Sequence, residues 1–307
     1  MADNARADYT RADDITADEI GADATTVGTG APEKREETTR RYYETGDVDG
    51  FYDAVWGGED IHIGIYAHTQ EPVADASQRT VRYAADQVAD LLGPHATVLD
   101  LGSGYGGSAR ALAERFGCRV VALDVSEQHN HRHRAANARR GLDGLIEVVT
   151  GSLADLPYEA GRFDVVWSLE VLSHVEDKKG ALAEAVRVMK PGGGLVFSDI
   201  MADEQAPPEV LWPALSRLVT QHLATPFDYL ESLAQLGLKA RFEDRTGDVA
   251  THYARLDEEV HRRAAELRTV ISPAYVDDLL ANLPLWADIT RRGLLRWGLF
   301  HARRTMV

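Results

Sequence analysis

The sequence contains a single cysteine and lacks any apolar run of about 18 residues, the length that a membrane-spanning helix needs. Because Cys118 is the one cysteine, an internal disulfide is excluded, which fits a reducing cytoplasm. The ordinary role of such a cysteine is to fill space in the core. The N-terminus also has no apolar stretch of the kind found in signal peptides. We therefore expect a cytoplasmic protein with no membrane partner.

Basic residues are scarce as well, since 33 Lys and Arg stand against 49 Asp and Glu, for a net charge of -16. Such a surface repels phosphates, so we expect no nucleic acid partner. The excess of acids, with far more arginine than lysine, suits a high-salt cytoplasm, where screening weakens self-repulsion. Ordinary acidic solubility explains the same composition.

The composition changes along the chain. Residues 1–38 carry no sustained apolar period and are expected to form a disordered acidic tail. Residues 39–80 are rich in aromatics and broken by glycines, which predicts a cap or lid segment. Residues 81–307 alternate short apolar runs with amphipathic stretches, and a helical insertion is expected at about 203–285. This rhythm predicts an α/β domain with a mostly parallel sheet and helices on both faces.

A glycine-rich loop follows the first expected strand in "VLDLGSGYGGSA", residues 98–109. Gly102, Gly104 and Gly107 match G-x-G-x-x-G, a pattern that alone also fits a nicotinamide enzyme. Asp100 would repel a pyrophosphate but can support a cationic amino group, and Asp124 after the second strand can accept both hydroxyls of a ribose. The implied ligand has a ribose, an ammonium group and no phosphate, as S-adenosylmethionine does. Asp124 as a turn acid and Asp100 as a helix cap are the alternative roles.

Three motifs, "VLDLGSGYGG", "GSLADLPYEAGRFDVVWS" and "VMKPGGGLVFSDI", resemble the class I S-adenosylmethionine-dependent methyltransferases. The resemblance implies a Rossmann-like, seven-stranded, mostly parallel sheet. It also implies a set of cofactor contacts: the backbone of Gly102, Ser103 and Gly104 along the methionine part, Asp124 at the ribose, Val125, Ser152 and Leu153 at the adenine, and the Leu169 backbone near the amino group. Many members have Asp where this chain has Ser152, which puts the contact to the adenine N6 in doubt.

The segment "RRYYETGDVDGFYDAVWGGEDIHIGIY", followed by "ASQRT", closely resembles the sarcosine/dimethylglycine N-methyltransferases, which make the osmolyte glycine betaine. "WSLEVLSH", "VATHYARL", "AELRTVISPAY" and "LLRWG" are similar to later signatures of the same group. More distantly, the pattern is similar to the phosphoethanolamine methyltransferases. The resemblance implies N-methylation of sarcosine, dimethylglycine or both.

The methylated nitrogen becomes cationic, and aromatic faces suit a diffuse cation. Candidate walls are Tyr42, Tyr43, Trp56 and Tyr66. The substrate carboxylate needs a fixed cation, for which the family resemblance favours Arg217 or Arg245, with Arg41 as a third candidate. Fastening a cap helix is the alternative role of the two neighbouring tyrosines, and filling the core is that of Trp56.

Tyr43 and His174 are the candidates for catalysis. His174 can accept the proton of the amine or hold a tyrosine that orders the site, and capping a helix is its alternative role. His62 either contacts the substrate or orients its own loop. His129, His131 and His133 alternate along an expected helix, which spreads the rings, so we expect no metal site.

Other functions stay open at this point. They are methylation of another small amine (glycine, phosphoethanolamine or a natural-product amine), a nicotinamide-dependent oxidoreductase, and a catalytically silent binding module. A monomer and a homodimer are equally compatible with the sequence.

Overall fold

The computed structural model describes residue 40, residues 45–215 and residues 222–305. The expected tail at 1–38 lies outside the described residues, and so do Arg41, Tyr42, Tyr43 and Arg217. Within the described part, no helix combines the length and the apolar content needed to cross a bilayer.

Seven strands form one sheet in the order β3-β2-β1-β4-β5-β7-β6. Their bounds are β1 Thr97–Leu101, β2 Arg119–Asp124, β3 Ile146–Thr150, β4 Phe163–Leu169, β5 Met189–Ala202, β6 Leu238–Asp244 and β7 Leu295–Arg304. β1 to β5 pair in parallel, and β7 runs antiparallel to both of its neighbours. The carboxyl ends of the parallel strands therefore meet at one edge, where open α/β sheets bind ligands. The expected Rossmann-like, mostly parallel, seven-stranded sheet is confirmed.

Adjacent residues on the central strands pack on opposite faces of the sheet. Val98 and Val120 belong to one core, whereas Leu99 and Val121 belong to the other. The first core includes residues of α3 (Val73–Asp86) and α4 (Gly107–Phe116), and the second includes residues of α6 (Lys178–Val188) and α8 (Pro226–Gln235). Both faces of the sheet are thus covered, which is why the central strands β1 and β4 are mostly apolar.

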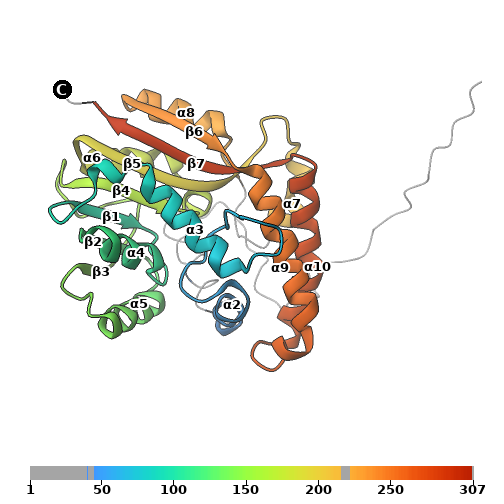
Figure 1. Ribbon diagram of the computed structural model, residues 1–307. Coiled ribbons are helices and arrows are strands. Elements are labelled where there is room, and N and C mark those ends of the chain that lie inside the picture. Colours follow the sequence, from blue (N-terminus) through green and yellow to red (C-terminus); the bar gives the residue numbers. More distant parts are fainter. Residues whose placement is uncertain (1–39, 41–44, 216–221, 306–307) are drawn as a thin grey trace, which may run out of the picture.

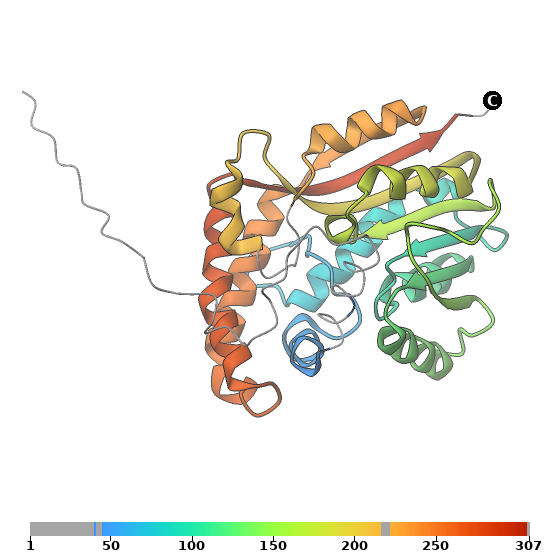
Figure 2. The same ribbon diagram turned by 180° about the vertical axis from the view of Figure 1, so that it is seen from behind.

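A further group of helices lies beyond the ligand-binding edge of the sheet. They are α2 (Gly46–Phe51), the π-helical turn η1 (Tyr52–Trp56), α7 (Pro208–Leu215), α9 (Thr246–Leu267) and α10 (Pro273–Arg291). Figures 1 and 2 show α9 and α10 side by side at this end, with α2 between them and the part of the sheet covered by α4 and α5 (Glu127–Arg140). We call residues 45–72, which contain α2, η1 and the loop after them, the cap.

The expected helical insertion at about 203–285 also contains a strand, because β6 occupies Leu238–Asp244. In "LKARFED" the apolar residues Leu238, Ala240 and Phe242 alternate with polar ones, which is the period of an edge strand and not of a helix. Its short length hid it between the long helical stretches. The helix α6 ends at Val188, and β5 begins directly after it and continues through Pro191 and the glycines that follow.

Candidate active site

The glycine loop between β1 and α4 has a conformation that requires glycine at two places. Gly102 has φ 71°, and a Cβ there would come within 2.4 Å of a Val171 methyl group. Gly106 has φ 81°, and a Cβ would lie 2.0 Å from the His133 ring. A side chain at either position would strain the turn and displace a neighbour. The backbone can therefore approach a ligand closely at this edge of the sheet.

Asp124 ends β2 and joins the next loop to the glycine loop. One carboxylate oxygen accepts the N–H of Gly104 at 2.8 Å, and the other accepts the N–H of Ser126 at 2.8 Å. A carboxylate can accept about four hydrogen bonds, so Asp124 keeps acceptor capacity for two ligand hydroxyls. This is the arrangement that binding of a ribose needs.

Asp100 lies in β1 and is buried, with one oxygen that has no hydrogen-bond partner among the described residues. Burial raises the pKa of its carboxyl group to about 7; His62 opposes this shift, and the carboxylates of Asp124 and Asp60 add to it. A buried acceptor without a partner is costly. An ammonium group of a ligand, directly or through water, would satisfy it.

A cavity that is partly open to solvent lies between the glycine loop and the cap. Its walls include the predicted cofactor residues Gly102, Ser103, Gly104, Asp124, Val125, Leu153 and Leu169. They also include Trp56, His62 and His174, all predicted for the substrate or for catalysis. The two predicted groups therefore line one space.

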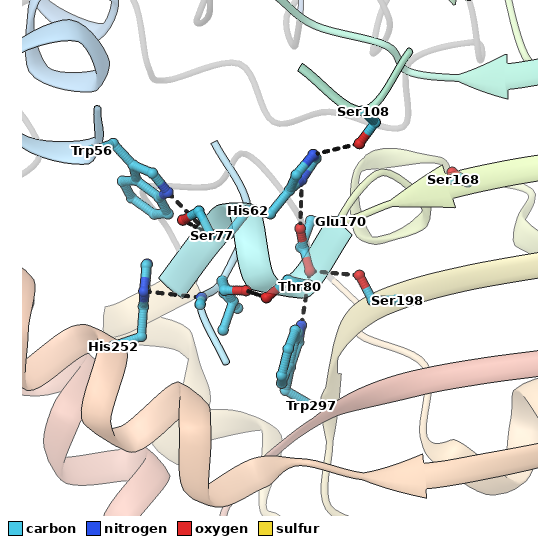
Figure 3. A network of polar contacts seen from close by, with 12 residues as sticks. Trp56, His62, Ser77, Thr80, Ser108, Ser168, Glu170, Ser198, His252 and Trp297 are labelled. Carbon is cyan, nitrogen blue, oxygen red and sulfur yellow. Dashed lines mark hydrogen bonds and ion pairs between the residues drawn. The ribbon is translucent and has the colours of Figure 1, made fainter. Parts of the chain in front are cut away.

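Glu170 is at the centre of the polar network around this cavity (Figure 3). Its carboxylate accepts hydrogen bonds from the Ser198 hydroxyl at 2.5 Å and the Trp297 indole N–H at 2.9 Å, and it lies 2.9 Å from Nδ1 of His62. Its φ of 55° is positive, which no other non-glycine residue shows in the described part of the chain. Such strain is found where a site fixes a side chain for function.

His62 belongs to the cap and joins it to the end of β4 and to α4. Its Nε2 is 3.1 Å from the Ser108 hydroxyl of α4, opposite the contact of Nδ1 with Glu170 (Figure 3). Burial by itself lowers the pKa of the imidazole, but the hydrogen bond to Glu170 and the carboxylates of Asp60 and Asp100 outweigh it, so the pKa is raised. The raised pKa favours the imidazolium form, whose charge would oppose that of the nearby carboxylates.

Trp56 both lines the cavity and belongs to the core, so its two predicted roles are compatible. Its indole N–H donates to the His62 carbonyl at 3.0 Å, and its ring centroid lies 4.6 Å from that of His252 in α9. Burial lowers the pKa of His252 to about 3. This histidine is therefore a neutral packing partner that accepts the N–H of Gly64 at 3.2 Å.

Three predicted residues do not line the cavity in the described structure, besides the buried Asp100. The Ser152 hydroxyl accepts the N–H of Ala154, and the Tyr66 hydroxyl contacts Nδ1 of His252 at 3.0 Å. Arg245 lies 2.9 Å from an Asp248 oxygen, and its guanidinium is 5.4 Å from the centre of the Tyr83 ring. The roles of Ser152, Tyr66 and Arg245 at the site stay predictions.

Glu170, Arg40 and Tyr105 are among the lining residues that sequence reasoning missed. Arg40 is the only arginine or lysine lining it within the described part of the chain. Glu170 could have been predicted from the sequence, because it follows β4 in "WSLEVLSH" and residues at strand ends on this edge often have functional side chains. Arg40 and Tyr105 had no comparable signal beyond their nearness to the "RRYY" and "GSGYGG" motifs.

The three histidines of α5 have different environments. His129 lines the cavity, His131 is exposed, and His133 is fully buried with a pKa lowered to about 3 by burial and then by Arg110 and Arg134. Among the described residues, no three His, Cys, Asp or Glu side chains are grouped as metal ligands would be.

Comparison with known proteins identifies the family to which this site belongs. A family model described as a methyltransferase domain matches residues 99–197. A sarcosine/dimethylglycine N-methyltransferase from Halorhodospira halochloris is 43% identical over 87% of this chain and 96% of that protein. A protein of the same name from Aphanothece halophytica is 38% identical over 85% of this chain and 95% of that protein. The crystal structure of a candidate sarcosine dimethylglycine methyltransferase from Galdieria sulphuraria superposes with a TM-score of 0.80, at 32% identity, covering 87% of this chain and all of that one.

Proposed function

The chain belongs to the sarcosine/dimethylglycine N-methyltransferase family, and from this premise we propose that it transfers methyl groups from S-adenosylmethionine to sarcosine and dimethylglycine, ending at glycine betaine. The observation that carries the proposal is the shared cavity, which joins a glycine loop and Asp124 to an aromatic cap and the His62–Glu170 pair. A nucleoside cofactor and a small amino acid can meet there.

The cofactor side of the cavity consists of the glycine loop, Asp124, Val125 and Leu153. Asp124 would hold the ribose hydroxyls, and the unpartnered oxygen of Asp100 would receive the ammonium group. When bound, S-adenosylmethionine supplies a methyl group activated by its positive sulfur. The residues of the chain align the two reactants and exclude water, which is the main catalytic contribution that such a displacement needs.

The substrate side consists of Trp56, His62, Glu170, His174 and Tyr253, with Tyr52 and Arg40 nearby in the lining. Ring faces of the aromatic residues can stabilise the cation that forms on the amine, and the Glu170 carboxylate can balance its charge. Arg40 is placed to pair with the substrate carboxylate, because its guanidinium is the one permanent cation that the described residues contribute to the lining.

The amine must be uncharged to attack. In our proposal, a ring nitrogen of His174, at the end of the short helix η3 (Leu172–His174), accepts its proton, and Tyr43 is the second catalytic residue. The pair of Glu170 and His62 fixes the amine opposite the cofactor. Cavity access for His174 supports this assignment.

Mass spectrometry of the products provides the test. Purified protein is incubated with S-adenosylmethionine and, separately, with glycine, sarcosine, dimethylglycine and phosphoethanolamine. We expect methylated products from sarcosine and dimethylglycine. Methylated product from another amine alone would show that the enzyme has a different substrate. Binding of S-adenosylhomocysteine without turnover of any amine would indicate a catalytically silent binding module. Calorimetry with NAD tests the nicotinamide alternative.

We also propose that the enzyme acts in the cytoplasm as a monomer or homodimer, without a nucleic acid or membrane partner. The net charge of -16 disfavours nucleic acid. Cys118 is free and buried, and burial raises the pKa of its thiol to about 11, so it is suited to packing and not to redox chemistry.

A further inference from the structure

A cluster of charged side chains joins three segments at the mouth of the cofactor side. The hydroxyl of Tyr105, in the glycine loop, donates to Asp49 of α2. Arg132 of α5 donates to Asp49 at 2.6 Å and to Asp53 of η1 at 2.6 Å. Its guanidinium also lies 4.3 Å from the centre of the Tyr105 ring. One arginine thus connects the cap, the glycine loop and the helix after β2.

This cluster touches the cavity itself. Tyr105 is only 3% exposed and lines the cavity, with its ring 4.8 Å from that of His129, another lining residue. Tyr105 directly follows Gly104, whose N–H is bound by Asp124. A force on Tyr105 is therefore transmitted over one peptide bond to the residues proposed to hold the nucleoside.

The cap is also attached to α9 and α10, mainly by apolar packing. Phe51, Val55 and Trp56 share an apolar core with residues of α9 and α10, and Asp47 binds the Ser272 N–H and hydroxyl at 2.7 and 2.6 Å. By contrast, the side chains of Arg132 and Asp53 are 32% and 54% exposed. Exposed ion pairs are weak and screened by salt, whereas a packed core is not. The ionic contacts of Arg132 with the cap therefore open more easily than the packed core does.

We propose that Arg132 is a positioning residue of the cofactor site, which fastens the cap to the glycine loop and sets the rate at which the nucleoside product leaves. The inference rests on the proposed function, because it takes S-adenosylhomocysteine as that product. The planar guanidinium of arginine suits this role. Its two terminal nitrogens donate to the carboxylates of Asp49 and Asp53, while its face lies over the Tyr105 ring.

The neighbouring Arg134 provides a matched control. It lies on the same helix and pairs with Glu127, away from the cap, with its side chain 44% exposed. Arg132→Gln, Arg132→Lys and Arg134→Gln are compared with the unaltered protein. The dissociation rate of S-adenosylhomocysteine is measured by displacement in a stopped-flow instrument, and hydrogen exchange is followed in residues 46–56 and in α9.

We expect Arg132→Gln to speed release by about tenfold, the size of losing charge-assisted contacts that are partly exposed. Arg132→Lys should lie between, since an ammonium keeps the charge but not the fork, and Arg134→Gln should stay within about twofold. Hydrogen exchange should rise in 46–56 and not in α9. Added potassium chloride should speed release from the unaltered protein and have less effect on Arg132→Gln.

Unchanged release and unchanged exchange in Arg132→Gln would overturn the inference while leaving the proposed function intact. If calorimetry shows that the unaltered protein does not bind S-adenosylhomocysteine, the proposed function fails instead. In that case the exchange of residues 46–56 without ligand still decides whether Arg132 holds the cap.

Discussion

On the cofactor side, the hydrogen bond from Gly104 to Asp124 spans 20 positions of the chain, whereas on the substrate side the contact of His62 with Glu170 spans 108 positions. The first side is assembled from loops at the ends of neighbouring strands. The second is assembled from the cap, the end of β4 and α9. A ligand bound at one side should therefore depend on different residues from a ligand at the other, and mutations can separate the two.

The largest effect is expected for Asp124→Ala. The change removes both acceptors for the ribose and releases the N–H groups of Gly104 and Ser126, so the dissociation constant for S-adenosylhomocysteine should rise about 1000-fold. Titration calorimetry measures it, with Asp155→Ala in an exposed loop as the control. Unchanged affinity would remove the ribose assignment and with it the distinction between the two sides.

Glu170→Gln tests the substrate side next. The amide keeps the shape of the carboxylate but removes its charge beside His62, so kcat/KM for dimethylglycine should fall about 100-fold. The affinity of Glu170→Gln for S-adenosylhomocysteine should change little. Steady-state kinetics and calorimetry of Glu170→Gln are compared with those of the control variant Glu147→Gln, which alters an exposed residue of β3. Equal losses in turnover and in cofactor affinity would mean that the two sides act as one.

The same difference in chain separation explains what could be predicted from the sequence. β1 and its loop form one continuous motif, so the motif alone predicts that Gly102 to Gly104 contact the ligand, and Asp124 follows from the next strand. β6 was missed because seven residues of alternating pattern lie between long helices. The bonds of Glu170 to Ser198 and Trp297 leave no sequence signal, because they depend on how β5 and β7 pair. Arg245, favoured by resemblance alone, lies against Asp248 and not in the lining.

Arg40 and Arg245 sharpen the substrate side further. Arg40 lines the cavity and Arg245 does not, so Arg40→Ala should raise the KM for sarcosine about 30-fold, the cost of losing a charge-assisted pair. Arg245→Ala should change it by less than about twofold. Initial-rate kinetics over a range of sarcosine concentrations distinguish the two. The reverse result would return the carboxylate site to the arginine that the family resemblance favours.

The smallest expected effect is a pH dependence that comes mainly from the cofactor side. Burial raises the pKa of Asp100 to about 7, so below pH 7 its carboxyl is mostly protonated and cannot pair with an ammonium group. Binding then costs the loss of a proton, and affinity for S-adenosylhomocysteine should rise about tenfold per pH unit at most as pH increases toward 7, and then level.

His62, whose pKa is also raised, adds to the same trend, because losing its charge removes a cation near the ligand ammonium. Calorimetry from pH 5.5 to 8 measures the slope, and Asp100→Asn should flatten most of it. A slope that persists in Asp100→Asn and disappears in His62→Gln would place the titrating group on the substrate side, and the pH dependence would then report the cap and not the strand end.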